Sequence, residues 1–380
     1  MTGGPAEVRC LLMRGGTSKG AYFLADDLPQ DPAARDELLL RIMGSPDPRQ
    51  IDGLGGAHPL TSKVAVVSVP DDPDDPDVDV DYLFLQVAVD TADVSDRQNC
   101  GNLLAGVGPF AVERGLVPAR EGQTSVRIRM VNTGDLATAS FPTSGGRVDY
   151  TGAARISGVP GTAAPVVIEF AQGGGPLLPT GRAREVIAGT RVTCVDNGMP
   201  TVLIPAQALD ITGYETPGEL EENSALRERL ERIRLEAGPL MGLGDVHDTT
   251  VPKLSLLAPP VQDGAVTTRT FIPHRCHTSI GVLGAAGVAA GLRVSGSIAE
   301  DIARLPPDGG RLRIEHPTGF IDIEAAVGTG GDGSPVVRRT AVVRTARKIF
   351  DGTVFPRPGQ TAPPCPGLPQ QGTAGDSPSR

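Results

Sequence analysis

A cysteine stands where an apolar segment of the chain begins. Cys100 lies in NCGN, Asn99 to Asn102, and the small and apolar residues after it predict a buried helix that starts at this cysteine and ends near Glu113 to Gly115. The first turn of a helix has unpaired N–H groups and a partial positive charge, so it favours a thiolate and binds carboxylates. Cys100, followed by the small Gly101, could therefore be a base near neutral pH beside an anion site. A buried, inert cysteine explains the same residues equally well.

Lys63 is the second candidate for proton transfer, because it begins an apolar strand predicted over residues 63–69. If the fold brings its ammonium near Cys100, the positive charge favours the thiolate, and a desolvated amine could itself exchange protons. An ordinary surface lysine at the start of a strand is the alternative interpretation.

A glycine-rich stretch near the start of the chain, LLMRGGTSKGAYFLADDLP, suggests an anion site of another kind. It does not fit the P-loop pattern, since Lys19 comes before Gly20, and it does not fit the dinucleotide-binding pattern. What remains is a strand and a tight turn with exposed N–H groups, two hydroxyls and two cations, which could bind a carboxylate. A plain hairpin turn is the alternative. The residues of this carboxylate-binding site would be Arg14, Thr17, Ser18 and Lys19.

Composition excludes several classes of protein. The net charge of −10, without clusters of Lys and Arg, argues against a nucleic-acid partner. No apolar stretch has the length of a signal peptide or a membrane span, and 5 scattered cysteines fit a reducing compartment, so we expect a cytoplasmic protein without a membrane partner. The 5 histidines lack the usual metal spacings, so we expect no metal site.

Length and patterning predict two domains of strands with few helices. A charged amphipathic helix is predicted at 219–238, and the acidic run Asp71 to Asp81 is predicted to be a solvated hairpin loop and not a calcium site. From Phe355 the chain is rich in Pro, Gly and Ser, which predicts a disordered tail, 355–380, and no catalytic role for Cys365. Further strands are predicted at 82–89, 125–131, 191–197, 201–206, 254–259 and 311–317.

The two halves of the chain resemble each other. When Cys100 is set over Cys276, several glycines and apolar residues coincide downstream, and Lys63 and Lys253 each begin an apolar strand. These matches favour a duplicated unit over chance similarity in a chain rich in Gly and Ala. Each unit would be a curved sheet wrapped around one apolar helix, and the starts of the two helices would face a shared cleft.

Several motifs together resemble the PrpF family over nearly the whole chain. They are MRGGTSKGAYF, DGLGGAHPLTSKVAVV, NCGN, GVPGTAAPVVIEF, DNGMPTVLIPA and RTARKIFDGTVF. The resemblance implies an α+β fold like that of diaminopimelate epimerase: two similar domains, each a curved, mostly antiparallel sheet wrapped around a central helix, with the site between them. We expect the domains at 1–185 and 186–354.

The family resemblance also implies a reaction, which is cofactor-independent proton transfer in an unsaturated di- or tricarboxylate. Lys63 of TSK and Cys100 of NCGN would be the acid/base pair. In epimerase relatives two cysteines face each other, so Cys276 is a candidate partner, although His277 or Ser279 could line the cavity instead. The further residues expected to contact substrate are Ser62, Asn99, Gly101, Asn102, Met199 and Thr278.

The segment from Phe271 to Gly291 resembles the 4-oxalomesaconate tautomerase branch of the family, which implies a role in the breakdown of aromatic compounds. A 2-methylaconitate or aconitate isomerase is the alternative enzyme. A non-catalytic carboxylate-binding protein would be favoured by loss of Lys63 or Cys100, but both are present. A racemase is disfavoured because the second half has no CGN motif. The sequence leaves the oligomeric state open, and a homodimer is compatible with it.

Overall fold

The computed structural model describes residues 7–70, 72, 75, 77–97, 99–171, 175–272, 274–306 and 310–359. Residues 355–359 form no helix or strand, and the predicted tail from residue 360 on, Cys365 included, lies outside the described residues. The strands of the first half are β1 (Val8–Gly15), β2 (Ser18–Leu24), β3 (Lys63–Ser68), β4 (Val80–Val87), β5 (Val94–Ser95), β6 (Gly122–Met130), β7 (Leu136–Ser144), β8 (Arg147–Val148) and β9 (Pro165–Phe170). Its helices are α1 (Pro32–Met43) and α2 (Gly101–Glu113).

The second half is built in the same manner. Its strands are β10 (Glu185–Ile187), β11 (Thr190–Asp196), β12 (Pro200–Pro205), β13 (Lys253–Ala258), β14 (Val266–Ile272), β15 (Arg275–Cys276), β16 (Leu312–His316), β17 (Gly319–Thr329) and β18 (Pro335–Val354). Its helices are α3 (Pro217–Glu222), α4 (Ser224–Leu240) and α5 (Val282–Leu292). Short 3-10 helices occur at Ala25–Asp27, Pro59–Thr61, Ala206–Leu209 and Ile298–Asp301. In the described part of the chain, no helix is both long and apolar enough to cross a membrane.

Strands pair in the same order in both halves. In the first half β1–β2 is antiparallel, β2–β3 parallel, β3–β4 antiparallel, β4–β6 parallel and β6–β7 antiparallel. In the second half the pairs β11–β12, β12–β13, β13–β14, β14–β16 and β16–β17 repeat this alternation. The order of strand pairing in β1 to β7 therefore recurs in β11 to β17, although the gapless alignment on Cys276 does not match the start of α5 to the start of α2.

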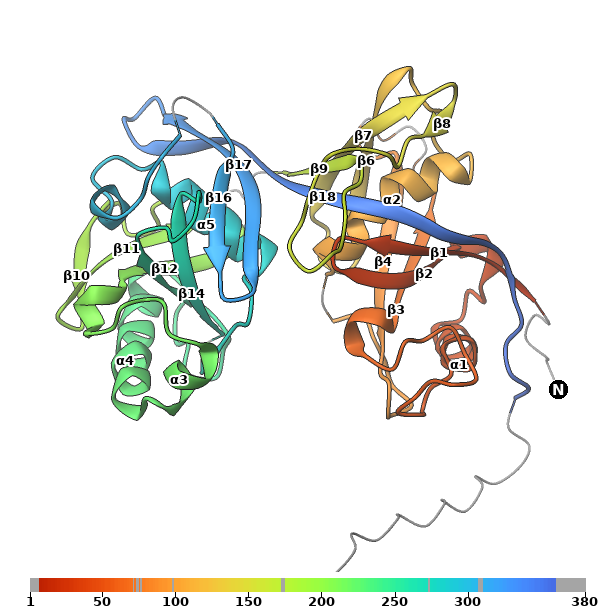
Figure 1. The fold of residues 1–380 in the computed structure, drawn as a ribbon, viewed down its shortest axis with the longest axis horizontal. Helices are drawn as coiled ribbons and strands as arrows, with labels where there is room; N and C mark the ends of the chain where they lie inside the picture. The colour runs from red at the N-terminus through yellow and green to blue at the C-terminus, as the bar shows by residue number, and fades with distance from the viewer. Residues whose placement is uncertain are drawn as a thin grey trace, which may run out of the picture.

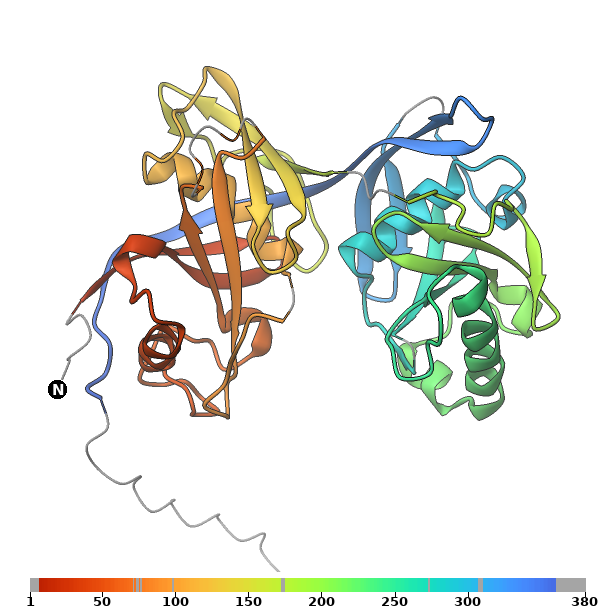
Figure 2. The same cartoon turned by 180° about the vertical axis from the view of Figure 1, so that it is seen from behind.

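The two groups of strands form two lobes, and β18 runs from one to the other (Figures 1 and 2). This strand pairs with β17 at residues 335–342, with β9 at 341–345 and with β1 at 346–354. The predicted second domain, 186–354, contained the whole of β18. Residues 346–354 lie instead in the first lobe, because their backbone groups complete the ladder of β1.

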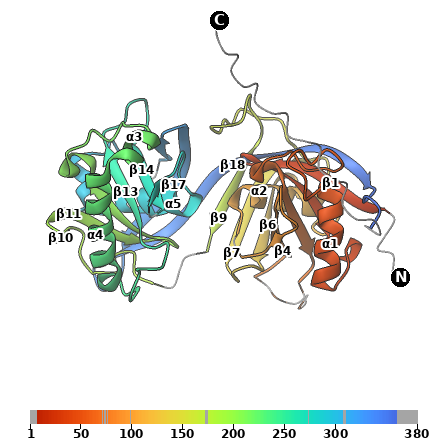
Figure 3. The same ribbon diagram turned by 90° about the horizontal axis from the view of Figure 1, so that it is seen from below.

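Each lobe has helices on both faces of its sheet, with α1 and α4 on the outer sides (Figure 3). In the first lobe Val64 and Val66 pack in the cluster around α1, whereas Ala65 and Val67 pack in the cluster around α2. Because both faces of β3 are covered, this strand is apolar at almost every position. The side chain of Lys63 follows the same alternation and points to the α2 face.

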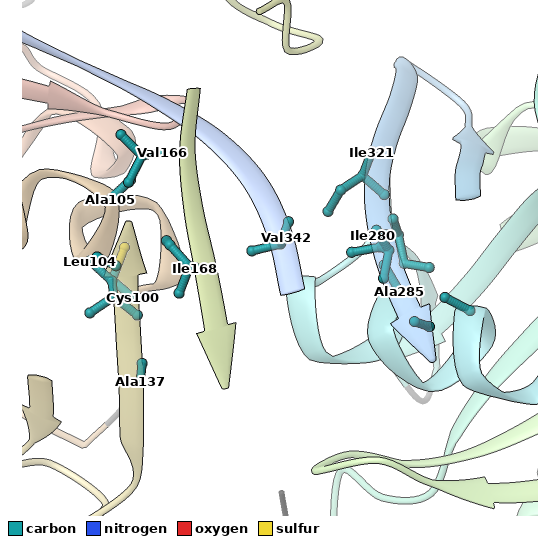
Figure 4. Close-up of a cluster of buried hydrophobic side chains, with 14 of the residues drawn as sticks. Cys100, Leu104, Ala105, Ala137, Val166, Ile168, Ile280, Ala285, Ile321 and Val342 are labelled. Atoms are coloured by element: carbon teal, nitrogen blue, oxygen red, sulfur yellow. The ribbon is translucent and has the colours of Figure 1, made fainter. Parts of the chain in front are cut away.

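Small residues let α2 pack closely in the first lobe. A Cβ atom on Gly106 would lie 2.4 Å from the hydroxyl oxygen of Tyr22, whose O–H donates to the carbonyl oxygen of Leu103 at 2.6 Å. The cluster of buried side chains around α2 includes Cys100, Leu104 and Ala105 (Figure 4). The close approach of Gly106 to Tyr22 fixes the distance between α2 and the sheet, and therefore the position of the first turn of α2.

Two predictions about helices need correction. The single helix predicted at 219–238 is α3 followed by α4, because Asn223 is extended and its side chain caps α4 by accepting from the N–H of Leu226. Helix α1 was not predicted, although Asp31 caps its start, Pro32 is its first residue and Gly44 ends it in a left-handed conformation.

Candidate active site

Cys100 is the N-cap residue of α2, as predicted. It is 9 % exposed, and no side chain caps the helix at this position. The carbonyl oxygen of Cys100 accepts from the N–H of Leu104 at 3.0 Å, and the hydroxyl of Tyr82 also donates to it at 3.4 Å. The thiol thus stands at the positive end of a buried helix whose first N–H groups have no intrahelical partner.

The start of α2 opens on a cavity of about 630 Å³ between the lobes. The first lobe contributes the residues from Asn99 to Asn102 and the turn after β6. The second lobe contributes the turn before β12, the first residue of β13, part of β14 and the start of α5. Two helix N-termini therefore face one cavity, which suits an anionic ligand.

Lys63 is almost completely buried at the start of β3, with 8 % of its surface exposed. Its ammonium donates to Oε1 of Gln86 at 2.8 Å and lies 4.9 Å from the ring centroid of Phe84. The amide of Gln86 donates in turn to the carbonyl oxygen of Ser62 at 2.8 Å, which fixes its orientation. Lys63 points to the α2 face, but it is not among the described residues that line the cavity.

The glycine-rich turn near the start of the chain is the β1–β2 hairpin, and it touches the first turn of α2. The side-chain amide of Asn102 donates to the hydroxyl of Thr17 at 3.1 Å. Gly16 has φ +51°, and a Cβ there would lie 2.2 Å from Oδ1 of Asn102, so this position suits only glycine. Arg14 donates to the carbonyl oxygens of Gly16 and Thr345, so its guanidinium holds the backbone of this turn.

In the second lobe His277 lines the cavity just before α5. Its Nδ1 accepts from the N–H of Ser279 at 2.9 Å, and burial together with the charge of Lys253 lowers its pKa. His277 is therefore neutral near pH 7, with a proton on Nε2 available for donation. The hydroxyl of Ser279 pairs with Nε2 of His316 at 3.1 Å, and burial lowers the pKa of His316 to about 4.

Cys276 does not match Cys100 in position. It lies in β15, whereas α5 begins at Val282 and is capped by Gly281. Cys276 is 5 % exposed, its sulfur is 3.8 Å from the carbonyl oxygen of His277, and burial raises its pKa to about 11. It is a buried thiol with no helix start to ionise it, so the sequence alignment does not make it a second active-site cysteine.

The family model described as "PrpF protein" matches residues 6–357. The chain belongs to the PrpF family. It is 54 % identical over 356 residues to the 4-oxalomesaconate tautomerase of Pseudomonas putida KT2440, covering 92 % of this chain and 96 % of that protein.

Solved structures agree with membership of the PrpF family. The crystal structure of a methylitaconate-delta-isomerase is 34 % identical, with a TM-score of 0.82 over 96 % of this chain and 99 % of that one. A hydroxyproline epimerase from Agrobacterium vitis is 16 % identical with a TM-score of 0.51, over 93 % of this chain and 94 % of that one, which shows likeness of fold alone. The predictions of the PrpF family, of an isomerase and of an epimerase-like fold rich in sheet are thus confirmed.

The cavity of this PrpF protein brings together part of the predicted site. The predicted residues that line it are Asn99, Cys100, Gly101, Asn102, Met199 and His277. The predicted residues that do not line it are Arg14, Thr17, Ser18, Lys19, Ser62, Lys63, Thr278 and Ser279. Ser62 is wholly buried and its hydroxyl donates to the carbonyl oxygen of Val87, so it supports the sheet under Lys63.

Sequence reasoning missed five polar residues that line the cavity, namely Asp135, Asn197, Lys253, Thr270 and Thr340. Lys253 had a signal, because it begins a strand of the repeat in the same way as Lys63. Asn197 also had one, because it lies in the motif DNGMPTVLIPA. Asp135, Thr270 and Thr340 had none, since they reach the cavity only through strand pairing and the contact between lobes. Within the described ranges, no group of three or more His, Cys, Asp or Glu side chains is arranged to hold a metal ion.

Proposed function

We propose that this PrpF protein is a cofactor-independent isomerase that moves a proton in 4-oxalomesaconate, with Lys63 and Cys100 as its acid/base pair. The observation that carries this proposal is the thiol of Cys100 at the N-terminus of α2, open to a cavity between the lobes. The high identity to a 4-oxalomesaconate tautomerase supports the choice of substrate.

The chemistry of the substrate suits this arrangement. 4-Oxalomesaconate has a methylene group between a keto group and a conjugated double bond, so loss of a proton there gives a dienolate. Return of a proton to the keto oxygen gives the enol, and return to the far carbon shifts the double bond; both leave the composition unchanged. N–H groups at the starts of α2 and α5 would stabilise the negative charge as it spreads over oxygen.

Lys63 enters this mechanism through its place on the α2 face of β3. A Cβ on Gly20 would lie 2.7 Å from the carbonyl oxygen of Lys63 and 2.9 Å from Cδ2 of Leu103, which places the backbone of Lys63 beside the first turn of α2. In this proposal the ammonium leaves Gln86 when substrate enters, and one member of the pair takes a proton while the other returns one.

We propose in addition that the lobes are two similar domains with a boundary between residues 185 and 186, and that residues 346–354 of β18 return to the first domain. The repeated order of strand pairing supports this division. The homodimer remains a prediction, and light scattering of the purified protein in solution tests it.

A methylaconitate-type isomerase is the second candidate, supported by 35 % identity to the 2-methyl-aconitate isomerase of Shewanella oneidensis. The two candidates use the same Lys63 and Cys100 and differ in substrate. Measurement of kcat/KM with 4-oxalomesaconate and with 2-methyl-trans-aconitate separates them. Higher kcat/KM with 4-oxalomesaconate supports the proposal, higher kcat/KM with the other substrate supports the alternative, and no turnover of either overturns both.

A further inference from the structure

We infer that Lys253 binds a carboxylate of the ligand in the cavity and so sets the preference of this site for tricarboxylates. The inference rests on the proposed function for the identity of the substrate. It rests for the site itself on four observations: the position of Lys253, its lack of a counter-ion, the charges around the cavity and the repeat.

Lys253 is the first residue of β13, partly buried, and it lines the same cavity as Cys100 from the other half of the chain. Its ammonium donates to the carbonyl oxygen of Thr250 at 2.6 Å. No carboxylate of the described residues lies within 4.0 Å of this ammonium, although 17 ion pairs between Lys or Arg and Asp or Glu form in the described part of the chain. An ammonium has three donors, so two remain for a ligand.

The charges around the cavity also favour this role. Among its described lining residues, Lys253 is the one Lys or Arg, and Asp135 is the one Asp or Glu. The carboxylate of Asp135 accepts from the hydroxyl of Thr133 at 2.6 Å, so it has a partner of its own. Burial and the nearby Arg234 lower the pKa of Lys253, as expected for an ammonium that lacks an anionic partner.

Lys63 and Lys253 hold equivalent positions in the two halves but have different neighbours. Lys63 pairs with Gly20 across the parallel strands β2 and β3, and Lys253 pairs with Thr201 across β12 and β13. The neighbouring strand gives Lys63 the amide of Gln86. In the second half Leu254 pairs with Phe271, and the next residue of β14 is Ile272, whose apolar side chain offers no hydrogen bond to Lys253.

Three places for negative charge thus surround one cavity: the start of α2, the start of α5 and the ammonium of Lys253, with the neutral His277 beside it. A dicarboxylate can occupy two of these places, and a tricarboxylate can occupy all three. The third carboxylate is therefore expected to add affinity only while Lys253 carries its charge.

Calorimetric titration of Lys253→Met with tricarballylate and with glutarate tests this inference. Glutarate has the same chain as tricarballylate without the middle carboxylate. In the wild type we expect tricarballylate to bind about 10- to 100-fold more tightly, as for a charge-assisted hydrogen bond. In Lys253→Met this ratio should fall close to one, and in Lys253→Arg it should be largely kept.

Lys348→Met is the matched control. Lys348 lies outside the lining of the cavity, and its ammonium is 2.6 Å from a carboxylate oxygen of Glu113. An unchanged ratio of affinities in Lys253→Met overturns the inference, as does an equal weakening of both ligands, which a merely structural role would produce. If Lys253→Met does not fold, Lys253→Gln takes its place in the same titration. A ratio that depends on Lys253 in a protein that fails to isomerise 4-oxalomesaconate would refute the proposed function and leave this inference standing.

Discussion

Alkylation of the native protein at pH 7.5 should modify Cys100 before the other described cysteines. Cys10 and Cys276 are 0 % and 5 % exposed, and burial raises their pKa values to about 12 and about 11. At pH 7.5 about 0.003 % of a thiol with the pKa of Cys10 is ionised, and about 0.03 % with that of Cys276, against about 10 % for a thiol of pKa 8.5.

The rate difference is smaller than these fractions, because a thiolate of higher pKa is a stronger nucleophile. With a Brønsted coefficient of about 0.45, Cys276 should react about 20-fold more slowly and Cys10 about 80-fold more slowly than an exposed thiol of ordinary pKa. Cys194 is wholly buried and burial also raises its pKa, so it belongs to the same slow class. Cys100 is 9 % exposed, but it lines the cavity at the N-terminus of α2, where the reagent can reach its sulfur.

The assay is iodoacetamide labelling followed by peptide mass spectrometry, in a Cys365→Ser background that removes the cysteine of the tail. We expect one fast modification, at Cys100, which tricarballylate slows. Labelling of Cys100 at the same slow rate as Cys10 would show that the thiol is inert, and the reasoning from the helix start would then be wrong.

Two further predictions concern Lys63 and His316. Lys63→Met should lower kcat by a factor of about 10² to 10⁴ with the fold intact, whereas Lys348→Met should turn over normally. Near-normal turnover in Lys63→Met would remove this residue from the mechanism. Because burial lowers the pKa of His316 to about 4, below an unfolded value of about 6.5, the unfolded chain binds the extra proton, and stability falls as pH decreases from 6.5 towards 4. Denaturant unfolding should show a loss of about 2 kcal/mol at pH 5 relative to pH 7.5, and His316→Gln should show a smaller loss. An equal loss in both proteins would mean that His316 does not titrate in this way.

Local signals in the sequence were enough for the start of α2 and for the β1–β2 hairpin. Cys100 precedes a run of small apolar residues, and that run forms the buried helix α2. The hairpin follows from Gly16, whose positive φ allows a tight turn. These predictions needed no knowledge of distant contacts.

Other parts of the site depend on contacts that spacing does not encode. Lys253 reaches the cavity because β13 pairs in parallel with β12 and the second lobe then faces α2. Cys276 matched Cys100 in the alignment, but extra residues between β15 and α5 take it away from the helix start. Lys63 is held by Gln86 from β4, and only the register of that strand reveals the partner.

Proton NMR of 4-oxalomesaconate in deuterated water, with the wild type, Lys63→Met and Cys100→Ser, tests the central claim most directly. The account predicts fast isomerisation by the wild type, with deuterium incorporated into the product, and loss of this conversion in both variants. Conversion at the wild-type rate in both variants, or no conversion above the uncatalysed rate in the wild type, would contradict the claim that Lys63 and Cys100 transfer the proton.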